Sequence, residues 1–142
     1  MDRRVFIRMG MLGAATGIIA PKIVLAGPLG EKISSNPMAG GLFYTMESPG
    51  RWAKKAGSHS PIIEKSEDGV KVITSHPMDP GKHWIIKHVI LDKDFKFIAE
   101  NIFDPTTQKA AISDFKLSGQ AGAIYALSVC NIHDTWLTVL EA

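Results

Sequence analysis

Short apolar stretches, separated by polar turn signals, fill the chain from residue 61 onward. Clusters such as Glu67-Asp68-Gly69 and Asp104-Pro105-Thr106 lie between these stretches and are typical of turns that connect strands. Seven short strands at this spacing, without a sustained helical period, predict an all-β fold, an antiparallel β-sandwich. The predicted strands are Pro61–Lys65, Val70–Ser75, His83–Leu91, Phe95–Phe103, Lys109–Leu117, Ala121–Val129 and Thr135–Glu141.

One short helix is predicted just before the first strand. Ser48 is a suitable N-cap, Pro49 fits the first helical position, and Gly57 is a typical residue at a helix C-terminus. The helix would therefore end just ahead of His59, so that this histidine lies in the loop that follows it.

Residues 1–26 are interpreted as a twin-arginine export signal. Arg3-Arg4 opens it, a Gly/Ala-rich apolar stretch follows, and Val24-Leu25-Ala26 supplies small residues at the positions that a signal peptidase reads. Pro21 and Lys22 interrupt the apolar run, which is then shorter than the roughly 20 residues of a membrane span. We expect cleavage after Ala26, export to the periplasm and no membrane attachment. An ordinary secretory signal or an uncleaved anchor is the alternative.

About 116 residues would remain after cleavage, which is enough for one small domain and too few for two. Residues 27–44 begin with a stretch rich in Gly, Pro and Ser, and we predict a flexible leader there. Residues 45–142 would form the single domain. The sequence leaves the oligomeric state open, and a homo-oligomer is compatible with it.

The charge of the chain gives no sign of a nucleic-acid partner. The formal net charge of +2 includes Arg3, Arg4, Arg8 and Lys22 against Asp2. Without residues 1–26 the chain has 12 basic and 13 acidic residues and a formal net charge of −1, so its basicity belongs to the targeting segment. A single cysteine also excludes an internal disulfide.

Four of the five histidines and the only cysteine lie in three short clusters. The clusters are Ser58-His59-Ser60-Pro61, His76-Pro77-Met78 with His83 following, and Cys130-Asn131-Ile132-His133. One soft sulfur ligand with four borderline nitrogen ligands suits iron, copper or zinc rather than magnesium or calcium. One cysteine is too few for a zinc ribbon or an iron–sulfur cluster. We therefore predict a mononuclear site at His59, His76, His83, Cys130 and His133.

Each of these residues, taken alone, has a simpler interpretation. A lone histidine is more often a surface or hydrogen-bonded core residue, and this interpretation is retained for His88, which has no motif around it. A single cysteine is usually a small buried apolar residue, and Cys130 ends an apolar run. The whole set in three patterned clusters favours metal ligands.

In order and spacing, the three clusters resemble the superoxide reductases, namely the neelaredoxins and the iron-binding domain of the desulfoferrodoxins. That family has a His-x-Pro element, then His-Pro-Met with a second histidine, then Cys-Asn-x-His near the C-terminus. This chain has His59-Ser60-Pro61, His76-Pro77-Met78 with His83, and Cys130-Asn131-Ile132-His133. The resemblance covers roughly residues 45–142 and implies an immunoglobulin-like sandwich, in agreement with the predicted strands.

The resemblance implies an enzyme that reduces superoxide by one electron to hydrogen peroxide. It implies one iron per chain, with His59, His76, His83 and His133 in a plane, Cys130 on the axis and the sixth position open. No Cys-x-x-Cys element for a second iron centre is present, so the chain resembles the one-iron form. An electron donor, which the sequence does not identify, must come from outside, in the periplasm.

The chain departs from the family pattern before its first ligand. The family typically has Glu-Lys at the positions where this chain has Gly57-Ser58, and the lysine of that pair attracts superoxide. A local positive potential is enough to steer an anion, so Lys54, Lys55 and Lys82 are candidate substitutes. Solvated surface lysines are the simpler interpretation. A noncatalytic periplasmic iron-binding or electron-transfer module therefore stays open as the alternative function.

Overall fold

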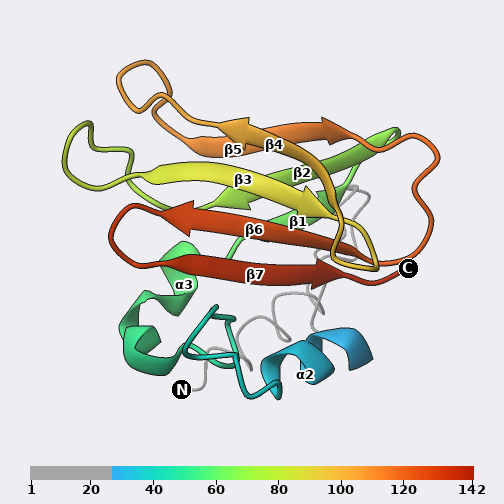
Figure 1. Cartoon of the computed structure of the whole chain (residues 1–142). Coiled ribbons are helices and arrows are strands. Elements are labelled where there is room, and N and C mark those ends of the chain that lie inside the picture. The colour runs from blue at the N-terminus through green and yellow to red at the C-terminus, as the bar shows by residue number, and fades with distance from the viewer. Residues whose placement is uncertain (1–26) are drawn as a thin grey trace, which may run out of the picture.

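In the computed structural model, residues 27–142 are described, and they form two packed β-sheets with short helices at one side (Figure 1). The interpretation of residues 1–26 as an export signal lies outside the described residues. All seven predicted strands are confirmed, with ends that differ by at most three residues. They are β1 Ile62–Lys65, β2 Gly69–Thr74, β3 Ile85–Leu91, β4 Phe97–Ile102, β5 Ala111–Lys116, β6 Ile124–Cys130 and β7 Thr135–Leu140.

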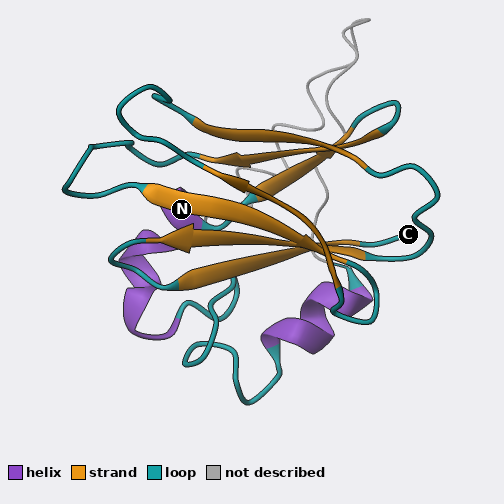
Figure 2. Cartoon of the chain, turned by 45° about the horizontal axis from the view of Figure 1, so that its top comes forward, coloured by secondary structure: helices purple, strands orange, loops and turns teal. Residues whose placement is uncertain are grey.

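The strands make a three-stranded sheet in the order β1-β2-β5 and a four-stranded sheet in the order β4-β3-β6-β7. Every strand pair is antiparallel. Figure 2 shows the two sheets as separate layers that face each other. The predicted antiparallel β-sandwich is therefore confirmed.

The main hydrophobic core lies between the two sheets because side chains alternate between the faces of each strand. In β5, buried and exposed residues alternate strictly along the strand. The core cluster consists of Ile63, Val70, Val72, Ile90, Phe115, Ile124, Ala126 and Leu140. This packing holds the strand ends, and the loops that leave them, in fixed positions.

A helix, α2 (Pro28–Ser34), forms within the residues assigned to a flexible leader. Pro28 occupies the start of the helix, and the Glu141 carboxylate accepts hydrogen bonds from the amides of Leu29 and Gly30. Ile33 is buried against the outer face of β6 and β7, in a cluster with Ala123, Tyr125, Leu137 and Val139. The sequence alone did not show this helix because its acidic cap lies more than 100 residues away. Among residues 27–142, no helix is long and apolar enough to cross a membrane.

The helix expected before His59 is present but differs from the prediction in its ends. It consists of a 3₁₀ segment, η1 (Gly50–Lys55), followed by one turn of α-helix, α3 (Ala56–His59). Ser48 does not cap it; the Ser48 hydroxyl donates to the Ser34 carbonyl instead. The helix also continues past Gly57, so His59 is its last residue.

His88 is a buried, hydrogen-bonded core residue, as predicted. Its ring is fully buried on β3, with Nε2 2.8 Å from Thr74 Oγ1 and Nδ1 2.9 Å from Ser113 Oγ. Thr74 in turn donates to the Ser128 hydroxyl, and Asn101 donates to Ser113. These hydrogen bonds link strands of both sheets in one polar layer. Burial lowers the pKa of His88 to about 4.

This buried histidine should make stability depend on pH. Unfolded chains protonate histidine near pH 6.5, whereas the folded protein keeps His88 neutral down to about pH 4. The unfolded state thus binds the extra proton, and the free energy of unfolding falls as the pH falls through this range. We expect His88 to contribute roughly 2–3 kcal/mol to the loss between pH 7 and 4.5, so His88→Gln should lose that much less stability than the wild type. Denaturant unfolding at both pH values measures it, and an equal loss in the two proteins would contradict the assignment.

Candidate metal centre

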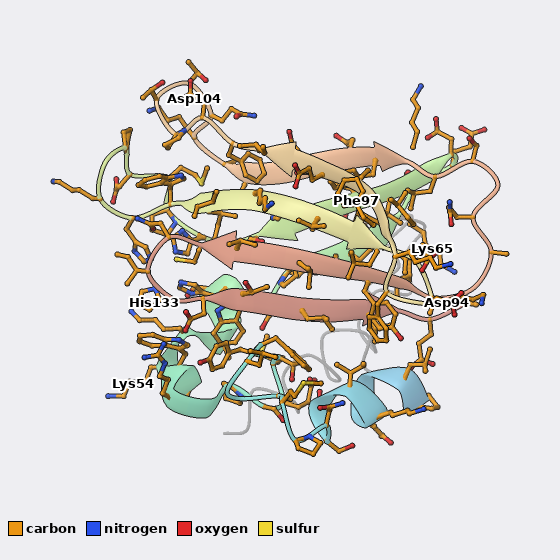
Figure 3. All side chains as sticks on the ribbon, in the orientation of Figure 1. Lys54, Lys65, Asp94, Phe97, Asp104 and His133 are labelled. Carbon is orange, nitrogen blue, oxygen red and sulfur yellow. The ribbon has the colours of Figure 1, made fainter. Side chains whose placement is uncertain are left out.

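Five side chains with metal-binding atoms meet at one rim of the sandwich. His59 ends α3, His76 and His83 lie in the β2–β3 loop, Cys130 ends β6, and His133 lies in the turn before β7. In Figure 1 these segments gather at the same edge, and Figure 3 labels His133 there. One atom from each of the five residues lies within 4.8 Å of all the others. The structure therefore brings together all five residues predicted as ligands.

The four imidazoles form a ring of facing nitrogen atoms. His59 Nε2 lies 3.1 Å from His133 Nδ1, and His133 Nδ1 lies 3.0 Å from His83 Nε2. His83 Nε2 lies 2.9 Å from His76 Nε2. The rings of His59 and His76, which close the circle, pack edge to face with centroids 4.4 Å apart.

The thiol of Cys130 approaches this ring of nitrogens. Its Sγ lies 3.2 Å from His83 Nε2, 3.6 Å from His133 Nδ1 and 3.8 Å from His76 Nε2. The sulfur is thus close to three of the four nitrogens. Cys130 and three of the histidines are buried, whereas His83 is partly exposed, so the cluster opens toward solvent on that side.

These distances fit a single metal ion. Ligand nitrogens about 2.1 Å from a metal and at right angles to each other are about 3.0 Å apart, and sulfur at about 2.3 Å lies about 3.1 Å from such a nitrogen. The spacing of the facing nitrogens, 2.9–3.1 Å, matches the first value, and the shortest sulfur–nitrogen distance of 3.2 Å is close to the second. The five residues therefore fit the mononuclear metal site that the sequence predicts.

The imidazoles are held in the neutral form that binds metals. Burial, followed by the charge of His76, lowers the pKa of His59 to about 3. Burial also lowers the pKa of His76 to about 4, and it lowers the pKa values of His83 and His133. Neutral rings present lone pairs to a cation without first losing a proton.

Backbone carbonyls orient two of the rings. His59 Nδ1 lies 3.0 Å from the Lys55 carbonyl, and His76 Nδ1 is hydrogen-bonded to the Pro77 carbonyl. Because these nitrogens then carry the ring protons, each ring directs an unprotonated Nε2 into the cluster. The carbonyl of the preceding helical turn is available to His59 because α3 extends as far as this residue.

Asn131 joins the cysteine loop to the β2–β3 loop. Its side-chain nitrogen donates to the Lys82 carbonyl over 2.9 Å, and its Oδ1 accepts from the Trp84 amide over 3.0 Å. The adjacent Ile132 amide points at Cys130 Sγ over 3.5 Å. These contacts fix the loop that holds Cys130 and His133 against the loop that holds His83.

Three tryptophans surround the cluster. Trp136 is fully buried and donates to the His133 carbonyl over 2.8 Å, and the partly buried Trp84 packs against the apolar cluster that includes Cys130. Trp52, which the sequence analysis did not single out, packs edge to face on the His133 ring with centroids 4.6 Å apart. No spacing pattern in the sequence could have revealed this contact, because the two residues are 81 positions apart.

The candidate steering lysines are not equivalent. The positive charge of Lys55 contributes to the lowered pKa values of His76, His83 and His133, so this charge acts on the cluster. Lys54 is exposed and extends outward from η1 in Figure 3. Lys82 is exposed beside His83. Of the three candidates, Lys55 is therefore the lysine whose positive charge acts most clearly on the clustered histidines.

A desulfoferrodoxin family model matches residues 51–139 of the chain. The chain belongs to the desulfoferrodoxin family. This confirms the resemblance to superoxide reductases, and the match spans all five clustered residues. The three sequence motifs that carry this resemblance come together in the fold at the cluster of five residues.

Curated relatives and solved structures agree with this assignment. The chain is 37% identical over 105 residues to a superoxide reductase of Pyrococcus horikoshii, which covers 61% of this chain and 87% of the relative. It is 35% identical over 111 residues to one of Thermococcus kodakarensis, with 67% and 93% covered. A solved superoxide reductase (neelaredoxin) from Ignicoccus hospitalis aligns with a TM-score of 0.54 at 26% identity, covering 72% of this chain and 94% of that one.

Removing the Asn131 side chain should loosen the connection between the two loops. Asn131→Ala leaves the Lys82 carbonyl and the Trp84 amide without these partners, so we expect the free energy of unfolding to fall by about 1–2 kcal/mol. Asn131→Asp keeps the acceptor for Trp84 but turns a carboxylate oxygen toward the Lys82 carbonyl, so it should also be less stable than the wild type. Denaturant unfolding measures both losses, and an alanine variant as stable as the wild type would contradict the expectation.

Proposed function

We propose that the chain is a periplasmic non-haem iron enzyme that reduces superoxide to hydrogen peroxide. The observation that carries this proposal is the convergence of four imidazole nitrogens and one cysteine sulfur within 4.8 Å, in a chain of the desulfoferrodoxin family. The relatives of this chain are named superoxide reductases. Superoxide is therefore the proposed substrate.

The proposed ligands of one iron per chain are His59, His76, His83, Cys130 and His133. Bound iron would supply the single electron that converts superoxide, with two protons from solvent, to hydrogen peroxide. The sulfur of Cys130 would raise the electron density of the centre, as thiolate ligands do in haem enzymes. The Ile132 amide, 3.5 Å from this sulfur, would moderate that effect, because hydrogen bonds to a ligand tune the potential of the metal.

Several residues of the chain would serve the reaction without touching the ion. Lys55 would attract the anion to the partly exposed side of the cluster, in place of the Glu-Lys pair that this chain lacks. Trp136, which is fully buried, would keep bulk water from the buried side, and Trp84 would shield the site beside His83. The electron would return from a separate periplasmic donor, since the described residues form a single cluster of this kind.

Iron is the proposed metal because of the proposed export route. A site with one sulfur and four nitrogen ligands suits iron, copper and zinc alike, so its ligands alone do not decide. Export of an already folded protein would let iron bind before the chain meets the copper and zinc of the periplasm. The proposed export signal at residues 1–26, if it acts as predicted from the sequence, thus favours iron as well as the periplasmic location.

The proposed role of Cys130 predicts an optical signature. The oxidised protein should show a visible thiolate-to-iron band and one iron per chain. Cys130→Ser should lose the band and keep its fold, because the residue lies at the rim and the main core between the sheets is intact. The matched control His88→Gln should keep both band and iron. Metal analysis with absorption spectra tests this, and zinc alone in the native protein, or a band that survives Cys130→Ser, would contradict the site.

The proposed role of Lys55 predicts the rate of superoxide capture. Neutralising the charge in Lys55→Gln should lower the bimolecular rate constant about fivefold at low salt and flatten its dependence on ionic strength. Lys54→Gln, one residue away and directed outward, is the matched control and should change the rate less. Pulse radiolysis of the ferrous protein measures both. Equal rates in the two variants would remove Lys55 from the mechanism, and ferrous protein that does not react with superoxide would leave the noncatalytic alternative.

The proposed location predicts the effect of changing the twin arginines. The double variant Arg3→Lys, Arg4→Lys should accumulate in the cytoplasm, because the twin-arginine pathway requires the pair. Cell fractionation measures the distribution, and mass spectrometry of the wild-type periplasmic protein should find Gly27 at the N-terminus. Undiminished export of the double variant would rule out this route.

A further inference from the structure

Asp134, directly after His133, is held in an unusual backbone conformation. Its φ is 63°, in the left-handed region where glycine is at ease and other residues are strained. Phe95 is the other non-glycine residue with positive φ among residues 27–142, and it lies in the β3–β4 turn at the opposite end of the sandwich. Aspartate tolerates this conformation better than most residues. The contacts of its carboxylate give a reason for an aspartate at this position.

The Asp134 carboxylate binds two consecutive residues of η1 through one oxygen. Arg51 Nη2 donates to Oδ2 over 2.7 Å, and Trp52 Nε1 donates to the same atom over 2.8 Å. Arg51 also donates to the Tyr44 hydroxyl over 3.4 Å, and its guanidinium lies 4.5 Å over the Trp52 ring. The start of the domain is thereby joined to its C-terminal end beside the cluster.

The hydrogen bond from Trp52 to Asp134 sets the position of the indole. Trp52 is the residue at which η1 departs from helical geometry, with φ −102° and ψ 29°. Its ring meets the His133 ring edge-on, with an angle of 90° between the planes. One side-chain hydrogen bond therefore joins Trp52 and Asp134, which both have an irregular backbone conformation. The indole that this bond holds in place packs against the His133 ring.

Asp134 is also connected to Cys130 and to the segment that carries His59. The Asp134 carbonyl accepts from the Cys130 amide over 3.0 Å, which closes the loop around His133. On the other side, η1 runs directly into α3, where the Lys55 carbonyl orients His59. Asp134 thus connects the segment of His133 with the segment that leads to His59, and these two histidines face each other across 3.1 Å.

We propose that Asp134 is a positioning residue that acts through Trp52 to fix the His133 ring against the helix of His59. It thereby sets the geometry of the metal centre. This inference rests on the proposed function only in requiring a metal at the cluster; it does not require superoxide as substrate. The ion pair with Arg51 is open to solvent, with 63% and 40% of the two side chains accessible, and such pairs contribute little. The positioning role is therefore assigned to the hydrogen bond from Trp52 to Asp134.

Two substitutions separate the carboxylate from the backbone. Asp134→Gly removes the carboxylate and leaves a residue that adopts positive φ at no steric cost, so any loss cannot come from strain. Asp134→Asn keeps an oxygen acceptor for Trp52 and loses only the charge. Trp52→Phe keeps an aromatic ring beside His133 and loses the N–H donor.

The experiment uses the full-length iron protein and three readouts, namely its reduction potential, the position of its thiolate-to-iron band and the rate of iron release to a chelator. Asp134→Gly should shift the band and the potential and release iron about tenfold faster, while Asp134→Asn should stay close to the wild type. Trp52→Phe should reproduce the glycine variant. The double variant should be no worse than either single one, because both remove the same contact.

Glu100→Gln is the matched control, since it breaks a remote ion pair with Lys87 of 2.9 Å on β3 and β4. It should leave all three readouts unchanged. A wild-type potential, band and release rate in Asp134→Gly, or additive effects of Asp134→Gly and Trp52→Phe, would overturn the proposal. Iron protein that ignores superoxide yet shows the predicted shifts would support the positioning role and refute the proposed function.

Discussion

The described part of the molecule is organised around the convergence of lone pairs at one rim. The facing imidazole nitrogens lie 2.9–3.1 Å apart, with a sulfur 3.2 Å from one of them. When these nitrogens are unprotonated, their lone pairs repel one another unless a cation lies between them. The surrounding protein preserves this arrangement. Burial disfavours protonation of the rings, and the carbonyls of Lys55 and Pro77 take up the outer nitrogens of two of them. The cluster is therefore prepared to bind a metal by residues that do not touch it.

The sandwich makes this convergence possible because it holds strand ends at fixed places. The ligand atoms come from three segments far apart in the chain, and the core between the sheets sets their separation. The polar layer around His88 joins the strands that lead to two of these segments, since Thr74 precedes His76 by two residues and Ser128 precedes Cys130 by two. Loops on such a scaffold can carry function without being rigid by themselves.

The sequence predicted the strands and the five clustered residues because each left a local pattern. Strands leave turn signals at regular intervals, and the ligands stand in short motifs such as Cys130-Asn131-Ile132-His133. The features that escaped prediction depend on partners remote in sequence. Helix α2 requires the carboxylate of Glu141, the Trp52 ring requires Asp134, and the choice of Lys55 over Lys54 requires the direction of a side chain. No spacing of residues along the sequence predicts any of these three features.

The most direct measurement of the central claim is the stoichiometry of products when the fully reduced, iron-loaded protein meets a limiting amount of superoxide. Reduction by one electron predicts one hydrogen peroxide for each superoxide consumed, one oxidised iron centre and no oxygen. Half an equivalent of hydrogen peroxide together with half an equivalent of oxygen, with the iron still reduced at the end, would mean disproportionation and would contradict the account.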